Sequence, residues 1–71
     1  MKEAGEVISQ FNRFIVCRSH KKAKTLLGGT LYSKEGIPLG TVVDIFGPVE
    51  RPYLKVVKKN EVQVRMLYYK E

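Results

Sequence analysis

The stretch LGTVVDIF at residues 39–46 carries the clearest strand pattern in the chain. Successive side chains of a β-strand point to opposite faces of a sheet. One expected face carries Leu39, Thr41, Val43 and Ile45, and the other carries Gly40, Val42, Asp44 and Phe46. Gly40 is expected to mark a bend or a bulge, which barrel strands need at their corners. Gly47 and Pro48 then end the strand, because proline lacks the backbone donor that a sheet requires.

Five further short segments show strand-like alternation between turn residues, which is typical of an all-β protein. We expect strands at residues 5–9, 13–18, 30–32, 53–57 and 61–68. In the last of these, one face is expected to carry Val62, Val64, Met66 and Tyr68. Residues 19–25, SHKKAKT, are polar and basic and predict a surface loop. No segment has a sustained helical period.

A chain of 71 residues allows one domain. Six short strands in this length are too few for a wide two-sheet sandwich, whereas closure into a barrel removes exposed sheet edges. The sequence therefore predicts a single all-β domain over residues 1–71, folded as a small six-stranded antiparallel β-barrel.

The charge balance is the first indication of function. Thirteen Lys and Arg residues oppose seven Asp and Glu residues, which gives a formal net charge of +6. That balance suits a position near nucleic acid, although net charge also keeps small domains soluble. No apolar run approaches the roughly 20 residues that span a bilayer. The polar start of the chain and its single cysteine indicate a protein of a reducing, cytoplasmic compartment.

The sequence offers no enzyme motif. His20 lies in a lysine-rich segment without a partner carboxylate nearby, and a solvated histidine is expected there. Cys17 follows Ile15 and Val16 within an expected strand, so a buried, inert thiol is favoured over a nucleophile. One Cys and one His cannot form a structural zinc site. We expect a binding module with no catalytic, cofactor-binding or metal-binding residues.

The connection after the clearest strand is unusually rigid. Pro48 and Pro52 each fix φ and remove a backbone donor. The connection is expected to project Phe46, Val49 and Tyr53 as a stiff apolar surface. Such a surface suits protein binding, because little entropy is lost on docking. An alternative is that Phe46 and Tyr53 only cap the barrel core.

The sequence GTVVDIFGPVERPY at residues 40–53 closely resembles the core signature of the glycine-arginine-rich (GAR) protein family of H/ACA ribonucleoproteins. Residues 5–8 and 14–16 are similar to the first hairpin of that family. The resemblance covers most of the chain and implies a six-stranded barrel. It also implies a non-catalytic subunit that docks on the catalytic domain of a dyskerin-type pseudouridine synthase, with the guide RNA reached only indirectly. The chain lacks the Arg-Gly-rich tails of the eukaryotic members, which points to an archaeal protein.

In this family the subunit influences a mobile loop of the synthase and so promotes substrate turnover. We place the centre of the synthase contact on the rigid connection, at Phe46, Gly47, Pro48, Val49, Pro52 and Tyr53. Gly40 and Gly47 are expected to serve backbone geometry alone. The basic residues that could lie near nucleic acid are Arg18, Lys21, Lys22 and Lys24, with a solvated loop as the alternative. A monomer is expected in isolation.

Two other functions remain open from the sequence. A small basic barrel could bind RNA directly through an aromatic platform and a positive groove. The candidate stacking residues are Phe14, Tyr32, Tyr68 and Tyr69, and the candidate cations are Lys21, Lys22, Lys24, Lys58 and Lys59. These residues do not interleave on one strand face, which disfavours the idea. A translation-factor-like module of a longer chain is the weaker alternative, since Met1 and the charged end at residues 70–71 favour a free-standing subunit.

Overall fold

Six antiparallel strands close into a barrel in the order β1-β2-β5-β4-β3-β6. This computed structural model describes residues 1–61 and 63–71. The elements are β1 (Lys2–Gln10), β2 (Phe14–Arg18), the 3-10 helix η1 (Ala23–Leu26), β3 (Thr30–Tyr32), β4 (Pro38–Phe46), β5 (Tyr53–Lys58) and β6 (Met66–Tyr69). The predicted all-β barrel is therefore confirmed. No helix in the described part of the chain is long and apolar enough to cross a membrane.

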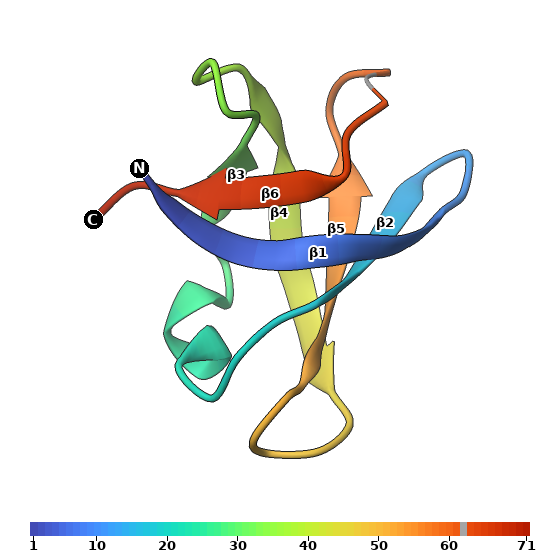
Figure 1. The fold of residues 1–71 in the computed structure, drawn as a ribbon. Helices are drawn as coiled ribbons and strands as arrows, with labels where there is room; N and C mark the ends of the chain where they lie inside the picture. The colour runs from blue at the N-terminus through green and yellow to red at the C-terminus, as the bar shows by residue number, and fades with distance from the viewer. Residues whose placement is uncertain (62) are drawn as a thin grey trace.

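The connections are distributed over two ends of the barrel. The β4–β5 loop and η1 lie at one end, and the β3–β4 and β5–β6 connections lie at the other (Figure 1). The two chain termini lie side by side, because β1 and β6 pair directly (Figure 1). Residues 18–26 and 46–53, distant in sequence, are thus brought to the same end.

The core consists of one inward-facing set of side chains from all six strands and from η1. Its members are Ala4, Ile15, Cys17, Ala23, Leu26, Leu31, Leu39, Val42, Leu54, Val56 and Leu67. Ala23 and Leu26 show that residues 19–25 are not simply a surface loop, as the sequence suggested. Their side chains point inward because a 3-10 helix places residues three apart on the same side. Ser19 is also buried, and its hydroxyl donates to the Ala4 carbonyl.

A bulge in β4 changes the alternation that the sequence predicted. Val42 lies opposite Val56 on β5, but the next pair is Asp44 with Lys55, which leaves Val43 without a partner on β5. Val43 is consequently exposed, whereas Ile45 packs against the core. The expected shared face of Val43 and Ile45 is wrong, because one extra residue inverts every later side chain.

The last strand is shorter than expected. Strand β6 spans Met66–Tyr69, and its half-buried Met66 and Tyr68 alternate with the fully buried Leu67. The expected common face of Met66 and Tyr68 is therefore confirmed, and it is the face turned away from the core. Val64 lies before β6 and packs against the core, and Val62, expected on the same face, lies outside the described residues.

Candidate functional site

The β4–β5 loop leaves β4 through a glycine that no other residue could replace without strain. Gly47 has a φ of +91°, in the left-handed region that favours glycine. A Cβ at this position would lie 2.8 Å from Cδ2 of Tyr53. The Tyr53 ring therefore packs on the bare backbone of Gly47, and the loop begins against an aromatic surface.

The two prolines of the loop have different surroundings. Pro48 is exposed, whereas Pro52 is buried. The Pro52 carbonyl accepts a hydrogen bond of 2.8 Å from the Ser19 backbone N–H. This bond joins the end of the loop to the segment that follows β2. Between the prolines, Val49 is 82% exposed, which is the largest exposure among the large apolar side chains of the described residues.

Three side chains form a row on the outside of the barrel, across β2, β5 and β4. Arg18 and Phe46 both lie opposite Tyr53 in the strand register. The Phe46 and Tyr53 rings stack with centroids 5.4 Å apart and an angle of 23°. The Arg18 guanidinium carbon lies 4.5 Å from the Tyr53 ring centroid. Phe46 and Tyr53 thus face outward, away from the side of β4 and β5 that carries the core.

Arg18 also fixes Tyr53 through hydrogen bonds. Its Nη1 donates to the Tyr53 hydroxyl oxygen at 2.7 Å, and its Nε donates to the Arg51 carbonyl oxygen at 2.9 Å. The guanidinium therefore holds both the aromatic ring and the backbone at the end of the loop. Two of its donors are committed within the protein, so Arg18 contributes to the shape of this surface.

A groove of about 190 Å³ lies between the loop and residues 21–24, where η1 begins. It is lined by Lys21, Lys24, Ile45, Phe46, Gly47, Val49 and Pro52. The loop provides an apolar wall and the η1 segment provides two lysines. Four of the six residues that the sequence placed in the synthase contact line the groove, while Tyr53 stacks behind Phe46.

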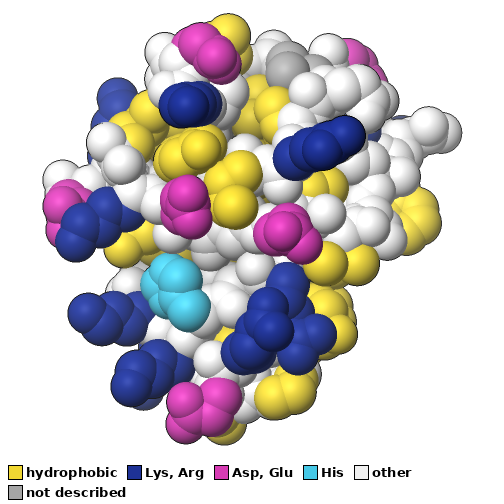
Figure 2. Space-filling view, viewed as in Figure 1, with side chains coloured by type: hydrophobic (Ala, Val, Ile, Leu, Met, Phe, Trp, Pro, Cys, Tyr) yellow, Lys and Arg dark blue, Asp and Glu magenta, His cyan; other side chains and the backbone are white. Residues whose placement is uncertain are grey.

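The basic residues around residue 20 are separated by the fold. Lys21 and Lys24 line the groove, Lys22 does not, and Arg18 belongs to the aromatic row. In Figure 2, Lys and Arg side chains lie on both sides of the histidine, with hydrophobic side chains along the lower right edge. Of these four basic residues, Lys21 and Lys24 are the two that line the groove.

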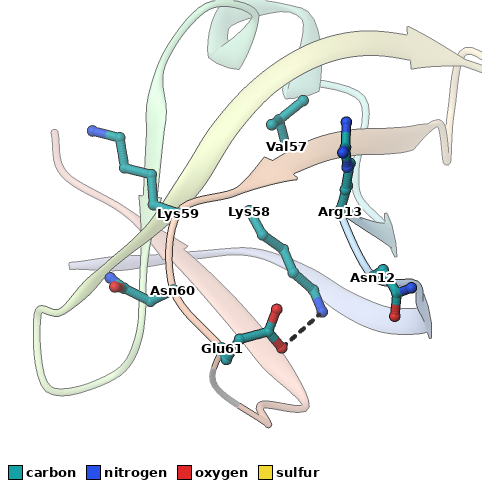
Figure 3. A pocket seen from close by; sticks show the side chains of 7 residues that line it. All are labelled: Asn12, Arg13, Val57, Lys58, Lys59, Asn60 and Glu61. Atoms are coloured by element: carbon teal, nitrogen blue, oxygen red, sulfur yellow. Dashed lines mark ion pairs between the residues drawn. The ribbon is translucent and has the colours of Figure 1, made fainter.

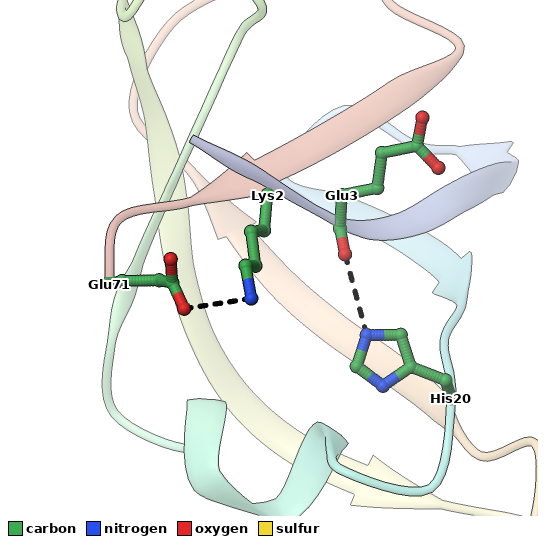
Figure 4. Close-up of polar contacts among 4 residues, drawn as sticks. All are labelled: Lys2, Glu3, His20 and Glu71. Carbon is green, nitrogen blue, oxygen red and sulfur yellow. Dashed lines mark hydrogen bonds and ion pairs between the residues drawn. The ribbon is translucent and has the colours of Figure 1, made fainter.

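His20 has a structural role. Its Nδ1 accepts from the Lys22 backbone N–H at 3.3 Å, and its Nε2 lies 3.4 Å from the Glu3 carbonyl oxygen. These contacts are compatible with the neutral tautomer that carries its proton on Nε2. Figure 4 shows the ring pointing at the backbone of β1, near the ion pair of 2.9 Å between Lys2 and Glu71. The histidine joins the η1 segment to the barrel wall.

Cys17 is fully buried. Burial raises the pKa of its thiol to about 11, although a backbone hydrogen bond at Leu54 partly opposes that rise. The thiol stays protonated at neutral pH, and the expectation of a buried thiol is confirmed. Within residues 1–61 and 63–71, no group of three or more His, Cys, Asp or Glu side chains could hold a metal ion.

The aromatic residues suggested for RNA stacking lie in different parts of the barrel. Tyr32 on β3 lies opposite Tyr68 on β6, whereas Phe14 lies on β2 and Tyr69 packs against the core. Lys55 Nζ lies 4.2 Å from the Phe14 ring centroid, and Lys70 Nζ lies 4.6 Å from that of Tyr32. One face of the Phe14 ring and one face of the Tyr32 ring are therefore occupied by a lysine of this chain.

The remaining candidate cations, Lys58 and Lys59, lie at the opposite end of the barrel from the β4–β5 loop. They line a hollow with Arg13, and Lys58 points toward Glu61 at 3.8 Å (Figure 3). This ion pair neutralises one of the three cations. The candidate cations for RNA binding are therefore divided between two ends of the barrel.

Sequence reasoning missed two contributors to the site. Ile45 lines the groove because the β4 bulge places it next to the loop. The sequence placed Arg18 only among the residues near nucleic acid, although its position opposite Tyr53 makes it part of the aromatic row. The alternation of β2 indicates the face on which Arg18 lies. Its partner Tyr53 is set by the pairing of β2 with β5, which the sequence alone does not show.

A protein-family model described as the Gar1/Naf1 RNA binding region matches residues 1–70. A comparison with curated proteins found no match. The family match covers nearly the whole chain, including the segments outside residues 40–53.

Proposed function

The chain belongs to the Gar1/Naf1 family, which has a general accessory role in H/ACA ribonucleoproteins, and on this premise we propose its specific partner and action. The proposed partner is the catalytic domain of a dyskerin-type pseudouridine synthase. The proposed contact is the surface of the β4–β5 loop, with the groove beside it. In this proposal the chain is a non-catalytic subunit of a particle that modifies ribosomal RNA.

The observation that carries the proposal is an exposed apolar surface that the protein holds in one shape. Val49 is 82% exposed and Phe46 is 45% exposed. Phe46 is stacked on Tyr53, which is in turn held by Arg18. A surface ordered before binding loses little entropy on docking. Aromatic and apolar groups in such a position are typical of the residues that dominate interface energies.

The proposed action on catalysis is a shift between two states of the synthase. A bound subunit changes the population of a mobile loop only if it binds the two loop states with different affinity. The proposed subunit stabilises the state that releases product, and so promotes turnover of the substrate RNA. The subunit supplies no reacting group, consistent with the inert thiol of Cys17.

Two titrations at physiological salt test this proposal. In the first, the protein is titrated into the purified pseudouridine synthase, and in the second into an H/ACA guide RNA. Tight binding to the synthase with negligible binding to the guide RNA supports the accessory-subunit function. Binding to RNA alone, with an affinity that falls steeply as salt rises, contradicts it and favours direct RNA binding.

Replacement of Tyr53 by alanine tests the surface itself. Tyr53→Ala removes the support of Phe46 and the partner of Arg18. We expect the synthase affinity to weaken by about 1–3 kcal/mol. Val57→Ala, on the same strand and also exposed, is the matched control and should bind normally. If circular dichroism and thermal melting show that Tyr53→Ala unfolds the barrel, Tyr53 is a core residue and the proposed role is wrong.

A further inference from the structure

We propose that Lys21 and Lys24 select the segment of the synthase that enters the groove, namely an apolar side chain flanked by carboxylates. This inference rests on the proposed function and adds the chemistry of the partner segment. The loop side of the groove is built from Ile45, Phe46, Val49 and Pro52, and its opposite rim carries the two lysines. A groove with an apolar wall and a positive rim suits a partner segment that carries an apolar side chain between negative charges.

Backbone hydrogen bonds around η1 explain why the side chains of Lys21 and Lys24 lie on the same side of the turn. The N–H of Ala23 donates to the His20 carbonyl at 2.9 Å, and that of Thr25 donates to the Lys22 carbonyl at 3.1 Å. Such bonds make a 3-10 turn, in which side chains three positions apart lie above one another. Ala23 and Leu26 are thereby buried together.

The same spacing places Lys21 and Lys24 together on the groove and leaves Lys22 outside it. Burial of Ala23 and Leu26 fixes the turn, so the two ammonium groups are presented from an anchored backbone. Lys22 has the same charge and lies between them in sequence, and it therefore provides an internal control.

Both lysines are free to pair with a partner. The ion pairs among the described residues are Lys2–Glu71 and Lys58–Glu61, and both lie away from the groove. Glu50 is the carboxylate of the loop, but it does not line the groove. Asp44 does not line the groove either, and its carboxylate accepts a hydrogen bond of 2.8 Å from the Ile45 backbone N–H. The rim is therefore positive, and complementary potentials raise the association rate and the specificity of a complex.

The groove suits a side chain of a protein better than a nucleotide. Its volume of about 190 Å³ is below the roughly 300–1,000 Å³ that is usual for small-molecule sites. One face of Phe46 is already covered by Tyr53, so at most one face of this ring is open to a base. The two lysines could hold phosphates, but a phosphate chain would leave the apolar wall uncovered.

The test compares two double charge reversals with the same change in net charge. One variant is Lys21→Glu with Lys24→Glu, and the control is Lys22→Glu with Lys59→Glu. All four side chains are exposed, so both variants should melt like the wild type. Each is titrated into the pseudouridine synthase of the same organism at low and at raised salt, and separately into the guide RNA.

We expect the groove variant to lose about tenfold or more in synthase affinity at low salt, with the control within about twofold of the wild type. The difference in synthase affinity between the groove variant and the wild type should become smaller as salt rises, because salt screens exposed charges. Equal affinities of the two variants would overturn the inference and leave the proposed function intact, provided that Tyr53→Ala still weakens binding. A groove variant that loses only RNA affinity would also overturn it. Failure of the wild type to bind the synthase would overturn both.

Discussion

Gly40 and Gly47 each lie where a neighbouring group leaves no room for a side chain, but the neighbouring groups differ. A Cβ on Gly40 would lie 2.3 Å from the Val57 carbonyl oxygen, so β4 and β5 approach too closely there for any side chain. Gly47 instead combines a φ of +91° with the packing of the Tyr53 ring. Gly40 thus serves the barrel wall, whereas Gly47 serves the surface on which the proposed partner docks.

Replacement of Gly47 by alanine should therefore affect binding more than folding. A left-handed φ costs an L-residue about 1–2 kcal/mol, and the new methyl group would also displace the Tyr53 ring. We expect a lowered free energy of unfolding of that size in denaturant titrations, together with weaker synthase binding. Gly36→Ala is the control, because Gly36 has a φ of +92° but lies far from the loop. Equal synthase affinity of the two variants would contradict the role given to Gly47.

The buried thiol of Cys17 predicts a loss of stability at alkaline pH. Burial raises its pKa from 9.0 to about 11 in the folded chain. Below about pH 9 the thiol keeps its proton in both the folded and the unfolded chain, so its contribution to the free energy of unfolding is fully present. Between pH 9 and about 11 the unfolded chain releases the proton while the folded chain retains it, and the free energy of unfolding falls as pH rises.

The measurement compares the wild type with Cys17→Ala in denaturant titrations across that pH range. We expect the wild type to lose about 2–3 kcal/mol more than the variant by pH 11, since one unit of pKa corresponds to about 1.4 kcal/mol. The other ionisable groups are the same in both proteins, so their contributions cancel in the difference. Parallel curves would show that the thiol is not desolvated in the folded chain.

Among the elements, the sequence indicated most strands but not which side chains of each strand point into the core. Alternation and turn residues located β2, β3, β4 and β5 closely, because those signals are local. The bulge was not visible, since Val42 and Val43 are equally apolar and the pairing with β5 decides which one enters the core. The prolines of the loop were a local signal, whereas Arg18 joins Tyr53 only through the pairing of β2 with β5.

The η1 segment illustrates a signal that was present in the sequence but was obscured by composition. Ala23 and Leu26 are three residues apart, which is the spacing of a 3-10 turn with one buried side. The surrounding lysines made the segment look like a solvated loop. Burial of one side of a basic segment is what brings Lys21 and Lys24 to the groove.

Deletion of Val43 tests the bulge directly. Because Val43 is the extra residue, its removal makes the pairing of β4 with β5 regular and keeps Val42 and Ile45 on the core side. We expect a folded barrel that is destabilised by about 1–2 kcal/mol. The control is deletion of Lys55, which lies in the regular β2–β5 ladder and would force a register slip. The control should not fold by circular dichroism, and equal effects of both deletions would contradict the assigned bulge.

At the scale of the whole molecule, closure of the barrel joins the two ends of the chain. Strand β6 pairs with β1 on one side and with β3 on the other, so none of the six strands has an open edge. Leu67 contributes a fully buried side chain at this position. The rigid end that carries the loop and η1 therefore depends on a strand that lies at the end of the sequence.

Deletion of residues 66–71 should consequently abolish the folded state rather than loosen one end. Without β6, strands β1 and β3 expose unpaired backbone groups, and such edges pair with other chains. We expect loss of the cooperative thermal transition and aggregation in light scattering. Deletion of residues 70–71 alone removes the Lys2–Glu71 ion pair, whose side chains are 58% and 64% exposed. That shorter deletion should melt like the wild type, because exposed ion pairs contribute little. A barrel that survives the longer deletion would show that closure by β6 does not hold the fold together.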